Sequence, residues 1–216
     1  MKKNSGLKFL LLVVFLCLIA VSITLVVLGD ELMVLGIVLA IVNIALLITY
    51  ISVYNKIVRY KSKVKESLAL IDIHLKLRFD LIPNLVSTVK GYAKHEKEVF
   101  EEVTRLRNLA VNASSESEKL EYSNQLVPQM KNLIAVAEDY PKLQADKLFK
   151  NLMEQLVEVE DRIVSSRRIY DSNVGAYNTL IKTFPNNLVA NIYGFEEQTM
   201  FRIDTGENIC PKVSME

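Results

Sequence analysis

The chain has 216 residues, half of them apolar, and its 26 basic and 25 acidic residues leave a formal net charge of +1. Nucleic-acid binding requires a basic stripe on the folded domain, and the sequence contains none. Its two cysteines, Cys17 and Cys210, lie in an apolar segment and in the C-terminal tail, so we expect no disulfide between them. The composition therefore argues against nucleic acid as a partner and against a disulfide-stapled fold.

Two apolar segments dominate the N-terminal quarter of the chain. Residues 9–28 and residues 32–54 contain no charged side chain. The hydrocarbon core of a bilayer is about 30 Å thick and a helix rises about 1.5 Å per residue, so about 20 apolar residues cross it. We therefore predict two transmembrane helices in a multi-pass protein of the plasma membrane.

The first segment also has features of a signal peptide, because Lys2, Lys3 and Lys8 precede it. Signal cores are about 7 to 15 residues long and end in a small-residue cleavage site, whereas this segment is longer and has no such ending. A lipid anchor at Cys17 would need a small residue before the thiol, where Leu16 stands. We favour an uncleaved span.

Only Gly29, Asp30 and Glu31 separate the two segments, which predicts a tight turn because glycine accepts backbone angles that other residues avoid. Backbone groups in hydrocarbon must be satisfied internally, so we expect a transmembrane helical hairpin. Asn43 is the one amide at membrane depth. It bonds either the partner span or its own backbone, and the sequence does not distinguish these.

Basic residues flank the two segments, whereas the connecting turn holds only acids. Lys and Arg near span ends are retained in the cytoplasm, so we expect both termini there, with residues 1–8 as a basic cytoplasmic N-terminus. Beyond Glu66 acidic residues outnumber basic ones by 22 to 18, so the basic cluster belongs to the membrane junction. We expect this cluster to contact anionic lipid headgroups; its members are Lys56, Arg59, Lys61, Lys63 and Lys65.

Apolar residues recur every three or four positions after the second segment, which predicts amphipathic helices. The first such helix is expected to run from Leu68 to Leu106 and to end in a loop over residues 112–117. Its spacing stays in phase across Pro83, which favours a kinked helix. The alternative is a new helix with Asp80 as its N-cap and Pro83 in its first turn.

Two further helices are predicted, over residues 118–139 and 146–181. Tyr140-Pro141 closes the former, because the residue before proline is pushed out of helical geometry. No segment alternates like a strand, so residues 55–201 are expected to form a cytoplasmic antiparallel bundle of long helices in an all-α fold. The segment Phe184–Asn187, with Tyr193-Gly194-Phe195, folds back either on the bundle or on the membrane. Residues 202–216 are expected to be disordered.

A series of motifs runs through the predicted bundle. It begins with residues 78–86, RFDLIPNLV, followed by Val89-Lys90-Gly91-Tyr92-Ala93 and His95-Glu96. The later motifs are Tyr140-Pro141-x-Leu143-x-Ala145, Arg167-Arg168-x-Tyr170, Tyr177-Asn178-Thr179, Phe184-Pro185-Asn186-Asn187-Leu188 and Gly194-Phe195. In residues, order and spacing, this series resembles a known family of bacterial membrane proteins, the LemA family.

The resemblance implies a helical bundle with no established enzymatic activity and no cofactor. Some LemA-like proteins are associated with building specialised membrane compartments, and the family tends to be encoded near membrane peptidases or TPM-domain proteins. A partner of one of these kinds is therefore implied. The family generally looks single-pass, so the additional first span is the main departure of this chain.

The best candidate contact surface is a set of polar or small residues spaced for one face of a continuous helix. These residues are Asp80, Asn84, Ser87, Gly91 and His95. The ordinary alternative is a solvated helix back. Pro83 and Gly91 favour a contact role, because both lower helix stability.

Catalytic and metal motifs are weak throughout the sequence. A helical zinc site around His95-Glu96 would need a second histidine four residues later, where Val99 stands. Ser87-x-x-Lys90 has the spacing of some acyl-transfer enzymes without their accompanying elements. We therefore assign no catalytic or metal-binding residue and expect a membrane-anchored, non-enzymatic scaffold or adaptor; the alternative is a cytoplasmic-face hydrolase using His95 and nearby carboxylates.

Overall fold

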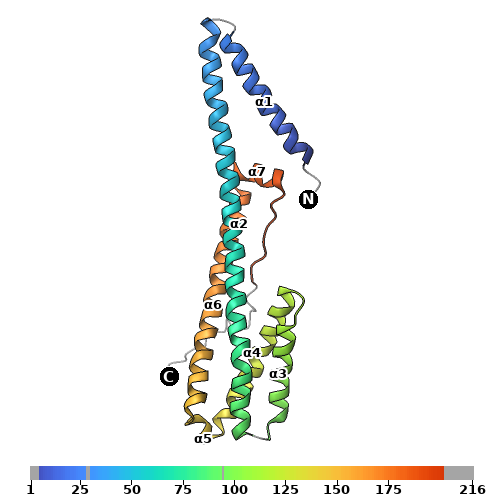
Figure 1. Cartoon of the computed structure of the whole chain (residues 1–216), viewed down its shortest axis with the longest axis vertical. Helices are drawn as coiled ribbons and strands as arrows, with labels where there is room; N and C mark the ends of the chain where they lie inside the picture. The colour runs from blue at the N-terminus through green and yellow to red at the C-terminus, as the bar shows by residue number, and fades with distance from the viewer. Residues whose placement is uncertain (1–4, 28–29, 94, 202–216) are drawn as a thin grey trace, which may run out of the picture. The chain divides into compact units, whose positions relative to one another are not determined.

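The structure is a computed structural model that describes residues 5–27, 30–93 and 95–201. Its described residues form helices and no strand, which confirms the all-α class. The helices are α1 (Ser5–Val27), α2 (Asp30–Tyr92), α3 (Lys97–Val111), α4 (Glu116–Glu138), α5 (Pro141–Gln144), α6 (Lys147–Lys182) and α7 (Asn186–Tyr193) (Figure 1). The tail expected to be disordered, residues 202–216, lies outside the described residues.

The chain divides into two compact units, to which α2 and α6 both contribute. The first unit comprises Met1–Glu66 and Tyr170–Glu216, and the second comprises Ser67–Ile169. The first unit therefore contains both predicted spans together with the C-terminal part of α6 and α7.

In the first unit, most side chains of residues 13–27 on α1 and 32–49 on α2 are exposed. The exceptions include Ser22, Gly36 and Asn43, which are buried where the two helices meet. Only 11% of the most apolar 18-residue stretch of α2 is buried, whereas a core helix of a soluble protein is mostly buried. By length and composition α2 can cross a membrane, and the described apolar part of α1 is Val13–Val27. Exposed apolar surface of this extent is typical of a site of contact with a membrane or with another protein. Its members include Val14, Leu16, Val21, Ile23, Val34, Ile41, Ile44 and Ile48.

α1 and α2 approach each other closely at Gly36. A Cβ atom there would lie 2.7 Å from Cγ2 of Val26 and 3.0 Å from the carbonyl oxygen of Ser22, so only glycine fits without a shift. Asn43 donates to the carbonyl of Leu39 at 2.8 Å and also approaches the Ser22 hydroxyl at 3.5 Å. The Asn43 amide therefore contacts both its own helix backbone and the neighbouring helix α1.

The segment after α7 runs back along α6 and is held by side-chain bonds to its backbone. Asn178 donates to the Gln198 carbonyl at 2.8 Å and accepts from the Gln198 N–H at 2.9 Å. Asp171 accepts from the Phe201 N–H at 2.8 Å, and the Tyr170 hydroxyl donates to the Thr199 carbonyl at 3.1 Å. These bonds give the non-helical backbone the partners that a helix would supply internally.

The second unit is built on α3 and α4, which pack along each other, with parts of α2 and α6 (Figure 1). The apolar stripes predicted from the sequence supply its core. Its deeply buried apolar residues include Ile71, Leu75, Phe79, Ile82, Val89, Val103, Leu126, Leu133, Leu143 and Ile163. Ser115 begins α4 as its N-cap, accepting from the Glu118 N–H, so the predicted loop ends earlier than residue 117.

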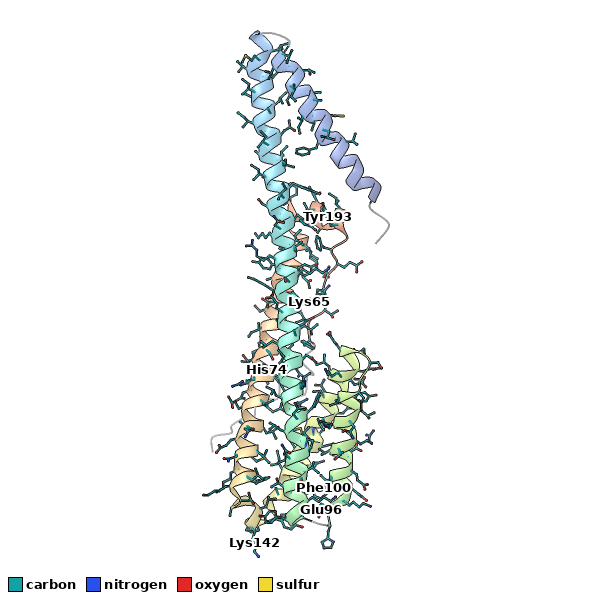
Figure 2. The ribbon with its side chains drawn as sticks, in the orientation of Figure 1. Lys65, His74, Glu96, Phe100, Lys142 and Tyr193 are labelled. Atoms are coloured by element: carbon teal, nitrogen blue, oxygen red, sulfur yellow. The ribbon has the colours of Figure 1, made fainter. Side chains whose placement is uncertain are left out.

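The prediction of one helix from Leu68 to Leu106 is wrong, because α2 ends at Tyr92 and α3 begins at Lys97. Ala93 and Phe100, near the two ends of the connection, are both buried, so the chain turns back while keeping its apolar side chains in the core (Figure 2). The apolar spacing stays in phase through this turn and cannot reveal it. Gly91 weakens the helix just before the break.

α2 continues through Pro83, so the alternative in which a new helix starts at Asp80 is wrong. Proline has no N–H, which leaves the carbonyl four residues earlier without its helical donor. That carbonyl belongs to Phe79, and Nε of Arg107 on α3 donates to it at 3.1 Å. A side chain from the neighbouring helix thus replaces the missing backbone bond.

This replacement predicts energetic coupling between Arg107 and Pro83. We expect Arg107→Ala to destabilise the second unit by about 1–2 kcal/mol in the natural sequence, because the Phe79 carbonyl loses its donor. In a Pro83→Ala background the cost should largely disappear, because the backbone N–H that alanine supplies then bonds that carbonyl. Thermal unfolding of the four proteins in detergent, followed by circular dichroism, measures the coupling.

Arg105→Ala is the matched control, since Arg105 lies on the same helix and pairs with Glu102 at the surface, at 2.7 Å. It should have the same small effect in both backgrounds. Equal costs of Arg107→Ala with and without Pro83 would contradict the assignment.

Candidate functional site

The C-terminal part of α2 presents the predicted polar face to the outside. Asp80, Asn84, Ser87 and Gly91 are all exposed. The opposite side of the helix is buried in the second unit by Ile71, Leu75, Phe79, Ile82, Leu85 and Val89. The helical period therefore separates a packed side from an outward side, which we call the α2 polar face.

His95 does not belong to that helical face. It is exposed in the turn between α2 and α3, beyond the end of α2 at Tyr92. The expectation that it continues the helical spacing from Gly91 is wrong, because the helix ends first. His95 follows the C-terminal end of α2 by three residues in the sequence.

Two apolar residues extend the α2 polar face toward the N-terminus and were missed by the sequence reasoning. Ile73 is 55% exposed and Leu77 is 42% exposed. Together with Asp80, Asn84 and Ser87 they follow alternating steps of four and three residues, which place them on one side of the helix. The spacing of Ile73 and Leu77 could have placed them on this face. They were missed because apolar residues next to the buried apolar stripe of α2 resemble members of that stripe.

A shallow groove of about 310 Å³ borders this face between α2 and α3. Its chemistry is set by two cations, Lys90 and Arg107, beside the hydroxyls of Ser87 and Thr104. Such a groove offers positive charge and hydrogen-bond donors to an anionic group. Its remaining lining residues are Ile82, Pro83, Val86 and Asn108.

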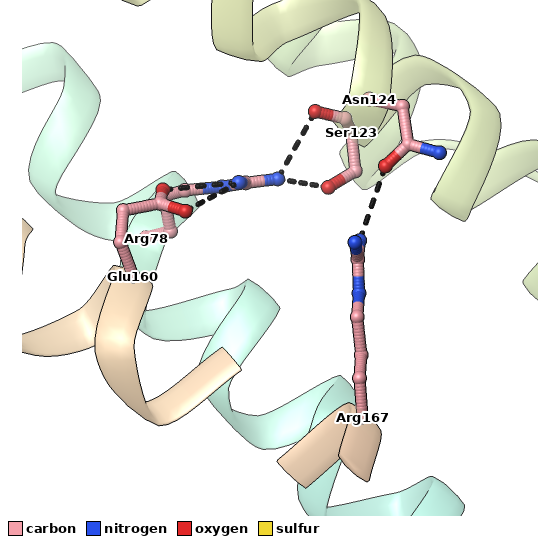
Figure 3. A network of polar contacts seen from close by, with 5 residues as sticks. All are labelled: Arg78, Ser123, Asn124, Glu160 and Arg167. Atoms are coloured by element: carbon pink, nitrogen blue, oxygen red, sulfur yellow. Dashed lines mark hydrogen bonds and ion pairs between the residues drawn. The ribbon is translucent and has the colours of Figure 1, made fainter. Parts of the chain in front are cut away.

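Beneath this face, a buried arginine joins three helices of the second unit (Figure 3). Arg78 on α2 is 1% exposed, and it donates to Glu160 on α6 at 3.0 and 3.3 Å. It also donates to the carbonyl oxygen of Ser123 on α4 at 3.1 Å and to the Ser123 hydroxyl. A buried guanidinium requires such partners, so the network fixes these helices in register.

Arg167, a residue of the family motifs, donates to the side-chain oxygen of Asn124 at 3.1 Å (Figure 3). Arg168 is exposed. On the same helix, Arg162 forms an i,i+4 ion pair with Glu158 at 2.5 Å. Arg167 thus has an amide partner on α4 of the same unit.

The end of α2 is tied to the start of α6 by a hydrogen bond from the Tyr92 hydroxyl to Asp146, at 2.8 Å. That hydroxyl, with the N–H groups of Phe149 and Leu148, lowers the pKa of the Asp146 carboxyl. The same contact raises the pKa of Tyr92. Asp146 thereby caps α6 as a carboxylate.

The sequence offered two catalytic possibilities, His95 with nearby carboxylates and the Ser87-x-x-Lys90 spacing. Among the described residues no hydrogen bond or ion pair joins His95 to a carboxylate, and no group of three His, Cys, Asp or Glu side chains is placed to hold a metal ion. Ser87 is exposed on the α2 polar face next to the groove that Lys90 lines. The geometry of the described residues therefore defines a surface and supplies no arranged set of reacting groups.

The five juxtamembrane basic residues are all exposed on α2 in the first unit. Lys61 lies over the ring of Phe195, with its Nζ 5.5 Å from the ring centroid, and Lys63 lies over the ring of Tyr60 at 5.2 Å. The aromatic segment at the C-terminal end of α7 therefore packs against α2 close to these bases.

These observations define an all-helical protein with an apolar helix of membrane-spanning length and a helical unit that presents a polar face. The sequence model of the LemA family matches residues 67–215, and the chain belongs to this family. The resemblance read from the motifs is thereby confirmed. The match begins after both apolar segments.

Relatives of known name include the magnetosome proteins MamQ 2 of Paramagnetospirillum magneticum and MamQ of Magnetospirillum gryphiswaldense. The former is 26% identical over 175 aligned residues and the latter 25% over 174, covering 69% and 68% of this chain. In both cases the chain spans 64% of the relative's length. Protein LemA of Metamycoplasma hominis is 25% identical over 162 residues, covering 72% of this chain and 74% of its own.

The Arg78 network predicts a large stability effect from a side chain that no partner can reach. We expect Arg78→Ala to destabilise the second unit by about 2–4 kcal/mol, because Glu160 and Ser123 lose their common donor while Glu160 stays partly solvated. Glu160→Gln should cost less, because an uncharged acceptor remains. Thermal unfolding in detergent micelles measures both.

Arg162→Ala provides the control, because its pair with Glu158 is exposed and worth less than about 1 kcal/mol. If Arg78→Ala and Arg162→Ala lowered the unfolding temperature equally, the network would not hold the three helices together.

Proposed function

We propose that this protein is a membrane-anchored, non-enzymatic scaffold that recruits a protein partner through the α2 polar face. The observation that carries the proposal is the continuity of α2, which runs from Asp30 to Tyr92 and includes both an apolar stretch of membrane-spanning length and the exposed polar residues. No loop interrupts the helix between anchor and face. A helix that is both anchor and display surface suits an adaptor.

The proposed anchor is a hairpin of two spans, residues 9–28 and 32–54, with both termini and the bundle of residues 55–201 in the cytoplasm. Three features support it: the close approach at Gly36, the contact between Asn43 and Ser22, and the basic residues on the outer flanks. Small residues and interhelical amides are common where membrane helices pack. Lys56, Arg59, Lys61, Lys63 and Lys65 would then meet anionic headgroups.

This topology predicts that reporters at the two ends of the chain behave alike. A reporter active only in the cytoplasm should be active when fused before Met1 or after Glu216, and silent when inserted between Gly29 and Asp30. Positive charge on both outer flanks is the reason. Termini on opposite sides of the membrane would refute the two-span anchor, and both termini outside would refute the orientation.

The proposed recruiting surface combines a polar centre with an apolar edge at Ile73 and Leu77. Interfaces of moderate affinity have this mixed character. Lys90 and Arg107 in the adjoining groove favour an acidic group on the partner. From the family resemblance, we propose a membrane peptidase or a TPM-domain protein as the partner.

Replacement of Asp80, Asn84 and Ser87 together by alanine tests the recruiting surface. Cross-linking in the native membrane, followed by mass spectrometry, should recover a specific partner with the natural chain and lose most of it with the triple variant. The reason is that the three side chains supply hydrogen bonds that alanine cannot make.

A matched control replaces Asn151, Gln155 and Asp161, three exposed polar residues of α6, by alanine. This variant should retain the partner and have the same membrane level. An unchanged set of cross-linked proteins in the first variant would refute the proposed surface.

A further inference from the structure

Residues 183–195 contain no charged side chain, which makes them the longest uncharged stretch of the chain outside its two apolar segments. Charged residues make up 24% of this protein, so thirteen uncharged residues in succession are distinctive. Two charged residues close the stretch, because Lys182 before it forms an ion pair with Glu197 after it at 2.8 Å. The stretch includes α7, whose polar residues include the amides Asn186, Asn187 and Asn191.

This uncharged segment lies at the point of α2 where the apolar stretch ends. The hydroxyls of Tyr193 on α7 and Tyr50 on α2 are 3.0 Å apart, and the rings of Tyr193 and Tyr54 have their centroids 4.6 Å apart. Figure 1 shows α7 crossing α2 there, and Figure 2 shows Tyr193 beside α2. Tyrosines, which combine an apolar ring with a polar hydroxyl, are typical of the membrane–water interface.

Gly194 ends α7 with a left-handed backbone, at a φ of 68°, and the Phe195 N–H bonds back to the Ala190 carbonyl at 2.9 Å. Phe195 is thereby returned to the same cluster, with its ring centroid 6.2 Å from that of Tyr54. The aromatic cluster thus fixes α7 at one height on α2.

α7 buries one side and leaves large apolar groups on the other. Val189 and Ala190 are buried, whereas Leu188 is 54% exposed and Phe184, just before the helix, is 79% exposed. Phe184 lies in the turn before α7 and Leu188 lies on the helix itself, and both side chains are exposed. An exposed phenylalanine in an uncharged segment, held beside the end of a stretch of membrane-spanning length, lies within reach of the apolar part of the bilayer that this stretch would cross.

We propose that α7 is an in-plane membrane contact: Phe184 and Leu188 enter the boundary between headgroups and acyl chains in the leaflet from which α2 emerges. The inference rests on the proposed span of α2. Interfacial helices bind in this way, with their apolar side in the acyl boundary and their polar side in the headgroups. The adjacent exposed bases Lys56 and Arg59 would contact the phosphates of the same lipids.

The test measures the depth of single labels in the full-length protein. Cys17 and Cys210 are replaced by serine, and a small environment-sensitive fluorophore is attached to a cysteine at position 184 or 188. The protein is reconstituted in vesicles of phosphatidylcholine and phosphatidylglycerol that carry a nitroxide either near the headgroup or deep in the acyl chain. Two matched sites serve as controls, Val157 on α6 of the second unit, 57% exposed, and Ile48 within the proposed span, 59% exposed.

We expect labels at 184 and 188 to lose most of their emission to the shallow nitroxide and little to the deep one. The label at 48 should be quenched by the deep nitroxide, and the label at 157 by neither. If labels at 184 and 188 behave like the label at 157 while the label at 48 is quenched, the membrane contact of α7 is wrong and the span of α2 stands. If the label at 48 is also unquenched, the span itself is wrong and the inference falls with it.

A second variant excludes insertion driven by the fluorophore alone. Leu188→Asp places a charge on the outward side of α7, where burial in the acyl boundary is costly. With the label at 184, this variant should show a clear loss of shallow quenching. Unchanged quenching would show that the label inserts by itself, and the contact would be rejected.

Discussion

The buried guanidinium of Arg78, which is 1% exposed, ties together three helices of the second unit. A guanidinium taken out of water must find acceptors for its N–H groups, and here they come from Ser123 on α4 and Glu160 on α6. The register of three helices is therefore tied to one side chain of α2. Because the helical period is fixed, orienting Arg78 inward also orients Asp80 and Asn84 outward. The surface proposed to recruit a partner thus depends on an interaction that the partner never touches.

A second constraint concerns the backbone of α2 at Pro83. The Phe79 carbonyl would lose its donor there, and Arg107 of α3 supplies one. This bond lets α2 continue to Tyr92, so that the polar face is carried on unbroken helix. It also brings a cation to the groove beside that face. One arginine therefore links the integrity of the helix to the chemistry of the adjoining surface.

Most of the helical architecture could be predicted from the sequence, because helices are specified by local periodicity. The two apolar segments, the stripe from Ile71 to Val89 and the long helix ending near Ile181 follow directly from spacing and composition. The turn at residues 93–96 could not be predicted, because Ala93 and Phe100 continue the same apolar phase. The helix α7 also escaped prediction, since its eight residues span only about two turns and its start, Pro185-Asn186-Asn187, has the composition of a loop.

For the site, the sequence by itself determined which residues of α2 can share a face, since this follows from the helical period alone. It also determined the family, through motifs that include Arg78, Asn178 and Gly194. Only the tertiary structure decided that Arg78 is buried, that Asn178 binds the backbone at Gln198, and that Gly194 turns Phe195 toward Tyr54. These contacts join residues far apart in the chain, and local spacing holds no information about which distant group will satisfy a buried charge or a free amide.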